Sequence, residues 1–235
     1  MKKIIVLIIA ISLFTVLTNT KAMINEYEEI AKSDKADVTL YAKKMNGVYT
    51  DFKIYFQGSV LTRPFWMNTT SPTWSPQIIY EDINKDGKNE LIIILTKGTG
   101  TGILEREVHV FHIQNKRIGK ELVEVPVEVL VDDPIAIVLK NVKTELLPNK
   151  AIINIGKKKY VIDTKPLKID TEHEHLFPDI YFGNIINFEI NDHQLIAKIG
   201  GQISPAGGNI GDIQVTYMFK EKMYQAKSIE FKPNE

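Results

Sequence analysis

A nine-residue stretch, Asp82 to Glu90, carries oxygen-bearing groups at the spacing with which a small loop can surround a hard cation. The candidate ligands are the side chains of Asp82, Asn84, Asp86 and Glu90 and the main-chain carbonyl of Lys88. Gly87 permits the sharp bend that a Cβ atom would hinder. Ca²⁺ takes six to eight oxygens in a flexible geometry, whereas Mg²⁺ demands a stricter octahedron. The stretch therefore predicts a calcium site.

Two other interpretations of this stretch can be compared with the calcium loop. An EF-hand needs an acid at its twelfth position and a helix on each side. Counted from Asp82, the twelfth residue is Ile93, and the flanking sequence is typical of strands, so the EF-hand is excluded. The plainer alternative is a polar turn between two strands, in which Asp and Asn serve turn chemistry. Turn chemistry does not require Glu90 at the ninth position, and this favours calcium.

The segment from Gln77 to Ile113 resembles the calcium loop of VCBS and FG-GAP repeats. The likeness depends on the pattern Asp-x-Asn-x-Asp-Gly-x-x-Glu and on the apolar Leu91-Ile92-Ile93 that follows it. In that family the loop joins two strands, and the resemblance implies the same five calcium ligands. Glu90 stands where Asp is commoner, and the chain has one loop where a propeller has several. The whole chain is similar to short secreted proteins of Gram-positive bacteria, a likeness that implies no activity.

The first residues of the chain have the three-part layout of a secretory signal peptide. Lys2 and Lys3 precede the uncharged segment Ile4–Leu17, and Thr20 and Ala22 are small residues placed as a signal peptidase requires. The apolar segment is short for a membrane span, which needs about 20 residues. We predict a cleaved signal peptide, with an uncleaved anchor as the alternative.

The predicted signal peptide is residues 1–22, and the mature chain is then 23–235. The mature chain has no second long apolar run, so we expect no membrane span in it. We expect the protein to be secreted or to lie on the extracellular face of the cell envelope. The chain has no cysteine, which excludes disulfides, thiolate metal sites and a Cys nucleophile. An exported chain of this kind must be stabilised by its core, by bound ions, or by both.

The charge balance argues against nucleic acid as a partner. The full chain has 29 basic and 29 acidic residues, and the signal peptide contributes Lys2, Lys3 and Lys21 but no acid. The mature chain then has 26 basic and 29 acidic residues, a net charge of −3. Nucleic-acid binding normally requires a strongly basic face.

The mature chain predicts a mostly β fold, in one antiparallel domain of the sandwich or meander kind. Short alternating or β-branched segments recur about every 8–12 residues, separated by turn signals. Asn46-Gly47 marks a hairpin, because both residues tolerate positive φ. The continuous apolar run Leu91–Leu95 predicts a strand buried on both faces. The β-branched segment Ile135–Leu139 is also expected to be a strand.

Two segments are expected to depart from strands. Ile24, Tyr27 and Ile30-Ala31 recur at helical spacing, which predicts a short amphipathic helix over Met23–Lys32. Thr62–Pro76 is rich in Pro, Ser, Thr and Asn, which predicts a loop.

Three aromatic residues in this predicted loop, Phe65, Trp66 and Trp74, are candidates for a binding surface. Exposed aromatic side chains on a loop can stack on sugar rings or dock a partner. The alternative is that they fill the edge of the core, because large aromatic residues dominate burial. A cell-wall glycan or an extracellular protein would be the partner.

The sequence selects no catalytic machinery. It has no nucleophile elbow, no zinc-protease motif and no Ser/His/Asp arrangement that its spacing supports. We predict a calcium-stabilised, non-enzymatic interaction module at the cell envelope. The alternative is an extracellular hydrolase of cell-wall or other glycans, whose carboxylates the sequence does not single out.

Overall fold

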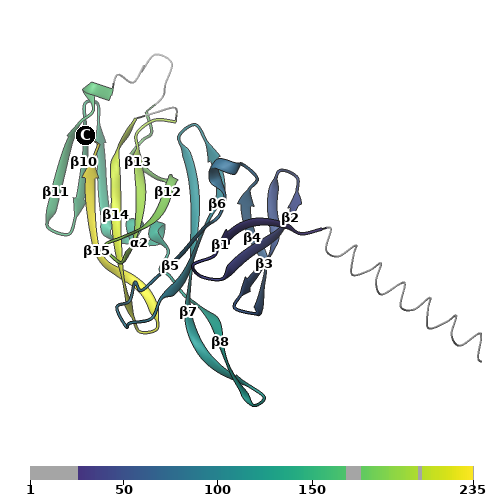
Figure 1. Cartoon of the computed structure of the whole chain (residues 1–235). Coiled ribbons are helices and arrows are strands. Elements are labelled where there is room, and N and C mark those ends of the chain that lie inside the picture. The colour runs from purple at the N-terminus through teal and green to yellow at the C-terminus, as the bar shows by residue number, and fades with distance from the viewer. Residues whose placement is uncertain (1–25, 168–175, 206–207, 235) are drawn as a thin grey trace, which may run out of the picture.

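The computed structural model describes residues 26–167, 176–205 and 208–234, most of which lie in β-strands (Figure 1). The predicted β-rich, largely antiparallel fold is confirmed. The predicted signal peptide at 1–22 lies outside the described residues. Within the described residues, no helix is long and apolar enough to cross a membrane.

Four antiparallel strands that follow one another along the chain form the N-terminal sheet. They are β1 (Glu28–Ser33), β2 (Val38–Met45), β3 (Val48–Phe56) and β4 (Ser59–Thr69). The predicted turn at Asn46 and Gly47 joins β2 to β3. Both residues have positive φ, 52° and 82°, which suits this type of hairpin. The N-terminal sheet is therefore a meander.

A larger, eight-stranded sheet, the central sheet, lies beside it (Figure 1). Its spatial order is β15 (Met223–Pro233), β14 (Asn209–Lys220), β13 (Gln194–Gln202), β12 (Tyr181–Asn191), β7 (Ile103–Ile118), β6 (Glu90–Gly100) and β5 (Gln77–Glu81). β8 (Glu121–Val129) pairs with β7 outside this order, and the two project from the body as a hairpin (Figure 1). Neighbours are antiparallel except β12 and β7, which are parallel.

The small sheet and helix α2 (Pro134–Asn141) cover one face of the central sheet. The small sheet has β9 (Val142–Leu147), β10 (Lys150–Ile155) and β11 (Lys158–Asp163), and the short helix η2 (Lys165–Leu167) follows it. The short helix η1 (Pro72–Trp74) joins β4 to β5. Val138 of α2 and Ile153 of β10 are buried in one core with Ile213 and Val215 of β14.

Strand β6 contributes to two hydrophobic cores. Ile92 and Ile94 pack in the core beneath the small sheet and α2. Leu91, Ile93 and Leu95 pack against the N-terminal sheet. Alternate side chains of a strand point to opposite faces, so one strand serves both cores. The predicted burial of Leu91–Leu95 on both faces is confirmed, and Glu90 lies at the entrance of this shared strand.

The helix predicted over Met23–Lys32 is wrong in its described part. Glu28–Ser33 is strand β1, paired antiparallel with β2, and residues 23–25 lie outside the described residues. A β-bulge between Glu29 and Ala31 interrupts the alternation, and both Ile30 and Ala31 pack against the core. Two adjacent inward-facing residues imitate helical spacing, and tertiary pairing overrides the weak propensity of so short a segment.

Two further segments differ from their predictions. Ile135–Leu139 lies in helix α2 instead of a strand, because Asp133 caps the helix by accepting a hydrogen bond from the Ala136 N–H (2.7 Å) and Pro134 occupies the first turn. The loop predicted over Thr62–Pro76 is strand as far as Thr69. β4 lies at the edge of the N-terminal sheet, where a proline is tolerated.

Candidate functional site

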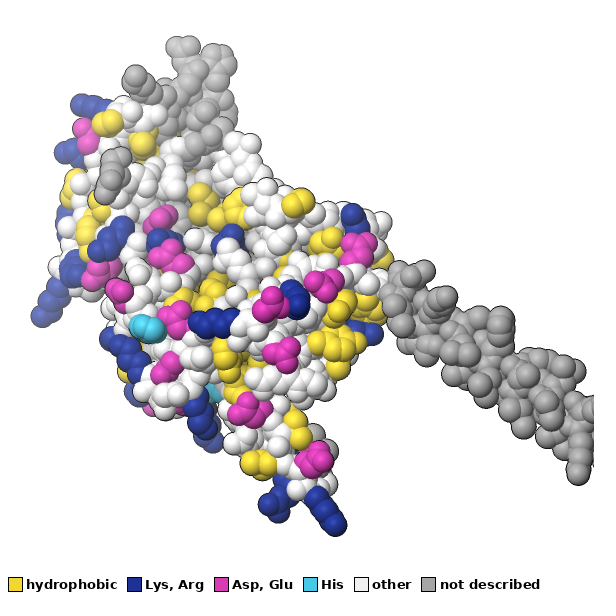
Figure 2. Space-filling model, in the orientation of Figure 1, with side chains coloured by type: hydrophobic (Ala, Val, Ile, Leu, Met, Phe, Trp, Pro, Cys, Tyr) yellow, Lys and Arg dark blue, Asp and Glu magenta, His cyan; other side chains and the backbone are white. Residues whose placement is uncertain are grey.

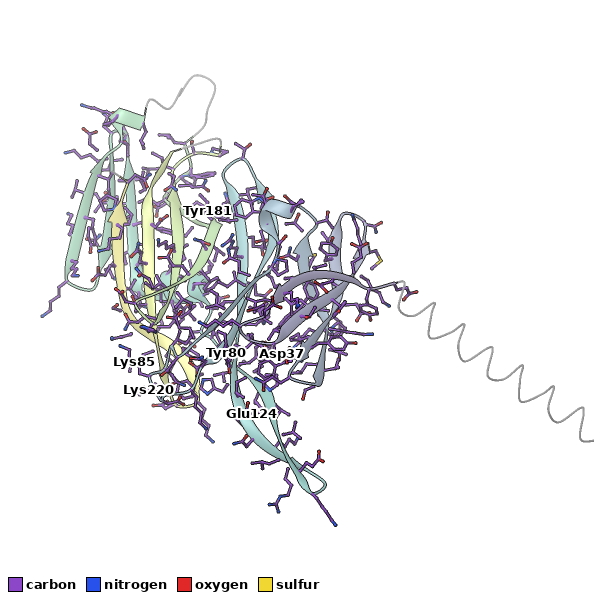
Figure 3. All side chains as sticks on the ribbon, viewed as in Figure 1. Asp37, Tyr80, Lys85, Glu124, Tyr181 and Lys220 are labelled. Atoms are coloured by element: carbon purple, nitrogen blue, oxygen red, sulfur yellow. The ribbon has the colours of Figure 1, made fainter. Side chains whose placement is uncertain are left out.

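The predicted calcium ligands lie in the loop between β5 and β6, which we call the 82–90 loop. The two strands pair from Gln77↔Ile94 to Glu81↔Glu90, so the ends of the loop are held together by the sheet. Figure 3 labels Tyr80 just before the loop and Lys85 within it. Lys85 and Gly87 have positive φ, 66° and 86°, which allows the chain to coil tightly.

Asp82 organises the main chain of the loop. Its Oδ1 accepts hydrogen bonds from the N–H groups of Lys85 (2.7 Å) and Asp86 (3.2 Å), and its Oδ2 accepts one from Gly87 (2.9 Å). Asn84 Oδ1 accepts from the Asp86 N–H (2.8 Å), and Asp86 Oδ1 accepts from the Lys88 N–H (2.9 Å). These contacts are all local, so the segment itself specifies the coil.

Glu90 is the first residue of β6, and its side chain is hydrogen-bonded to the loop. It is 2% exposed. Its Oε2 accepts from the Ile83 N–H (2.9 Å) and the Asn84 N–H (3.3 Å). The Asn84 amide nitrogen donates to Glu90 Oε1 (2.8 Å) and to Asp86 Oδ2 (3.3 Å). One donor thus lies between two carboxylates, at the point where these predicted ligands converge.

The negative charge of Glu90 is poorly compensated. Burial raises the pKa of Glu90 to about 7, two main-chain hydrogen bonds oppose that rise, and the charges of Asp86 and Asp82 add to it. Burial also raises the pKa of Tyr224, and the charges of Glu90, Asp86 and Asp82 raise it further. A divalent cation in the loop would reverse this unfavourable field.

The acids alone do not complete a metal site. Across the described ranges, no group of three or more His, Cys, Asp or Glu side chains is placed to hold a metal ion. Two of the five predicted ligands are of other kinds, the Asn84 amide and the Lys88 carbonyl. The oxygen donors suit a hard cation. To complete the set, the Asn84 amide must turn its oxygen toward Asp86 and Glu90 in place of its nitrogen.

The three aromatic candidates are not brought together in one surface. Phe65 is 97% exposed, whereas Trp66, its neighbour on β4, is 7% exposed and packs in the core under the N-terminal sheet. Trp74 lies in η1, half-buried, with the guanidinium carbon of Arg106 5.2 Å from its ring centre. Trp66 therefore matches the core interpretation, and only Phe65 is freely available to a partner.

Trp66 is part of a polar and aromatic cluster that the sequence did not reveal. The Trp66 cluster consists of Arg63, Trp66, His109 and Glu128. The His109 ring stacks on Trp66 with the ring centres 3.9 Å apart. Glu128 lies 2.8 Å from His109 Nδ1. Its Oε2 accepts a hydrogen bond from Arg63 Nε (3.0 Å) and forms an ion pair with Arg63 Nη2 (2.9 Å). The cluster joins β4 of the N-terminal sheet to β7 and β8 of the central sheet.

The carboxylate of the Trp66 cluster finds its partners within the cluster, in Arg63 and His109. Burial pushes the pKa of Glu128 upward, but His109 and Arg63 outweigh it, and the net pKa is lowered. His109 Nε2 is buried and lacks a hydrogen-bond partner. Glu128 is 19 positions from His109 and 65 positions from Arg63, so spacing in the sequence carries no signal for these contacts.

The hydrolase interpretation requires a pair of free carboxylates. Glu105 and Glu107 lie close together on β7, but both pair with Lys97, at 3.0 and 3.7 Å. Because Lys97 is shared by the two acids, neither is the free carboxylate that this interpretation requires. Among the described residues, no specific contact favours hydrolysis over binding.

Comparison with family models, with curated proteins and with solved structures finds no match to this chain. The resemblance of Gln77–Ile113 to the VCBS and FG-GAP calcium loop stays a prediction.

Proposed function

We propose that the protein is an exported, non-enzymatic binding module whose 82–90 loop holds a structural calcium ion. The observation that carries this proposal is the buried carboxylate of Glu90, which faces Asn84 and Asp86 across a coiled loop. None of the described lysines or arginines forms an ion pair with it. His112 Nε2 is 3.9 Å from Glu90 Oε1, and burial lowers the pKa of His112, which disfavours its charged form. A bound cation would compensate this charge.

The ion would stabilise the fold by fixing the β5–β6 hairpin. β6 belongs to both cores, so the end of the strand that carries Glu90 is coupled to most of the molecule. Extracellular calcium modules commonly bind at 0.1–1 mM, which corresponds to about 0.4–1.4 kcal/mol of stabilisation at about 1 mM calcium. That is a sizeable share of the net stability of a typical domain.

Export is supported by the N-terminal pattern of Lys2-Lys3, Ile4–Leu17 and the small residues that follow. We place the mature protein outside the cell or on the outer face of the envelope. A calcium site of this affinity is useful there, because extracellular calcium is plentiful and the chain has no disulfides to stabilise it.

A glycan of the cell wall is the partner that the exposed face of the N-terminal sheet suits best. Tyr41 and Tyr55 lie edge to face with ring centres 5.1 Å apart, and Tyr55 is 44% exposed. Their cross-strand neighbours include Lys53 and Val60. Figure 2 shows hydrophobic side chains interspersed with charged ones over this sheet. Aromatic rings beside polar groups are the chemistry that binds sugar rings.

Calorimetric titration of the mature chain with calcium tests the proposed ion. We expect one site with a dissociation constant near 0.1–1 mM, and Asp86→Ala should abolish it. Asp192→Ala, in the exposed β12–β13 turn, is the matched control and should bind as the parent does. The absence of binding heat in the parent, with a melting temperature that excess chelator leaves unchanged, would overturn the proposal.

Co-sedimentation with purified cell walls tests the proposed partner. Tyr55→Ala should reduce the bound fraction several-fold. Tyr181→Ala removes a tyrosine of similar exposure, 47%, from β12 and should bind as the parent does. Equal binding by the two variants would exclude the N-terminal sheet as the glycan-binding surface. The proposed calcium site would not be affected by that result.

A further inference from the structure

A small cleft opens where helix α2 begins, away from the 82–90 loop. Its volume is about 240 Å³. Its lining includes four apolar residues, Val108, Ile135, Ile186 and Phe188. It also includes two residues of opposite charge, Arg106 and Asp132. Pockets for drug-sized ligands span about 300–1,000 Å³, so this cleft suits a smaller molecule.

Arg106 is the unusual residue of this cleft. Its Nη1 donates to Asn187 Oδ1 (2.9 Å), and its guanidinium group lies beside the Trp74 ring. Its Nε is buried without a hydrogen-bond partner, and in the described part of the chain no carboxylate forms an ion pair with it. Burial alone lowers the pKa of Arg106. A half-buried arginine is normally paired with an anion.

Asp132 is the opposite charge that lacks a partner. Its main chain is fixed, because its N–H donates to the Tyr224 carbonyl (2.9 Å) and its carbonyl accepts from the Tyr217 hydroxyl (2.9 Å). Its carboxylate makes no hydrogen bond or ion pair with any described residue. The neighbouring Asp133 is occupied as the cap of α2.

The other charged groups of the cleft already have partners. Glu105 and Glu107 share one cation, Lys97, and the Asp133 carboxylate caps α2. Arg106 and Asp132 are the remaining two charged groups of the lining, and they form no ion pair with a described residue. A simple anion would be attracted by Arg106 but repelled by Asp132. A simple cation would be attracted by Asp132 but repelled by Arg106.

We propose that this cleft binds a small zwitterion, an α-amino acid with an apolar side chain. Its carboxylate would pair with the guanidinium of Arg106, whose fork geometry matches a carboxylate. Its ammonium group would pair with Asp132. Its side chain would pack on Val108, Ile186 and Phe188.

Calorimetry with leucine tests the proposal on the mature protein in saturating calcium. 4-Methylpentanoate has the leucine skeleton without the ammonium group, and 3-methylbutylamine has it without the carboxylate. We expect leucine to bind and each analogue to bind roughly 10- to 100-fold more weakly, because each loses one charge-assisted contact. No binding of leucine, or equal binding of either analogue, would overturn the proposal.

Two variants separate the charged contacts. Arg106→Gln and Asp132→Asn should each weaken leucine binding by roughly 10- to 100-fold. Arg117→Gln at the end of β7 and Asp192→Asn in an exposed turn are matched controls that should bind as the parent does. Full leucine affinity in the two cleft variants would overturn the proposal. Asp132→Asn keeps the main-chain contacts of Asp132, so it decides the outcome if Arg106→Gln does not fold.

Discussion

The 82–90 loop and the Trp66 cluster each contain a carboxylate whose pKa burial pushes upward, but they compensate its charge in different ways. The partners of Glu90 and Asp82 are main-chain and amide groups within seven positions along the chain. Glu128 is paired with Arg63, 65 positions away. The loop can coil from its own sequence, but neither of its lysines, Lys85 and Lys88, forms an ion pair with its carboxylates. The cluster supplies its own cation and requires the assembled fold. The first is suited to an ion and the second to joining two sheets.

The largest expected effect is the loss of the aromatic centre of the Trp66 cluster. Trp66→Ala should lower the free energy of unfolding by about 3–5 kcal/mol, because it empties a well-packed site between two sheets. Urea denaturation measures this. Phe65→Ala is the matched control on the adjacent, exposed residue and should change stability by no more than about 0.5 kcal/mol. Equal effects of the two variants would contradict the structural role of the cluster.

Removal of the charge of Glu128 should have a smaller effect. Glu128→Gln should cost about 1–2 kcal/mol at neutral pH, because Arg63 and His109 lose a charged acceptor. The folded-state pKa of Glu128 lies below its ordinary value of 4.5, so its contribution is present above pH 4.5 and is lost as pH falls through the folded pKa. Urea denaturation between pH 3 and pH 7 should show a weaker acid loss in the variant. Glu121→Gln, on the projecting hairpin, should keep the parent's acid profile.

Calcium should act on the loop alone. Chelation should lower the melting temperature by roughly 1–6 °C from that in about 1 mM calcium, since a gain of about 0.4–1.4 kcal/mol is lost. Scanning calorimetry of the parent, of Asp86→Ala and of Glu128→Gln compares the two regions. Asp86→Ala should lose the response and Glu128→Gln should retain it. A chelator response in Asp86→Ala equal to that of the parent would place the ion elsewhere.

The smallest expected effect is the most informative about Glu90. Glu90→Gln should be no less stable than the parent in chelator, because an uncharged amide is cheaper to bury than an unpaired carboxylate. It should gain nothing from calcium. Glu81→Gln, at the facing position of the hairpin, should keep the calcium response. A Glu90→Gln variant that is stabilised by calcium as strongly as the parent would exclude Glu90 as a ligand.

Features that depend on neighbours along the chain could be predicted from the sequence. The Asn46-Gly47 turn follows from the backbone freedom of two residues, and the burial of Leu91–Leu95 follows from an unbroken apolar run. The coiling of Asp82–Glu90 is of the same kind, because its hydrogen bonds join residues within seven positions.

Features that depend on distant segments were missed or misassigned. The bulge in β1 places Ile30 and Ala31 side by side against the core and imitates a helix. The helix that follows Asp133 is a different case, because its cap is a local contact with Ala136 and the β-branched composition of Ile135–Leu139 obscured it. The packing and pairing of segments far apart in the chain bring Trp66 to His109 and Arg106 to Asn187, and no spacing rule predicts such contacts.

Equilibrium dialysis of the mature protein against a series of calcium concentrations up to about 1 mM, followed by metal analysis, measures the proposed calcium ion itself. We expect up to one calcium ion per chain, with half-saturation near 0.1–1 mM, and none above background in Asp86→Ala. A parent protein that retains no more calcium than Asp86→Ala at any concentration in this range would contradict the proposed site.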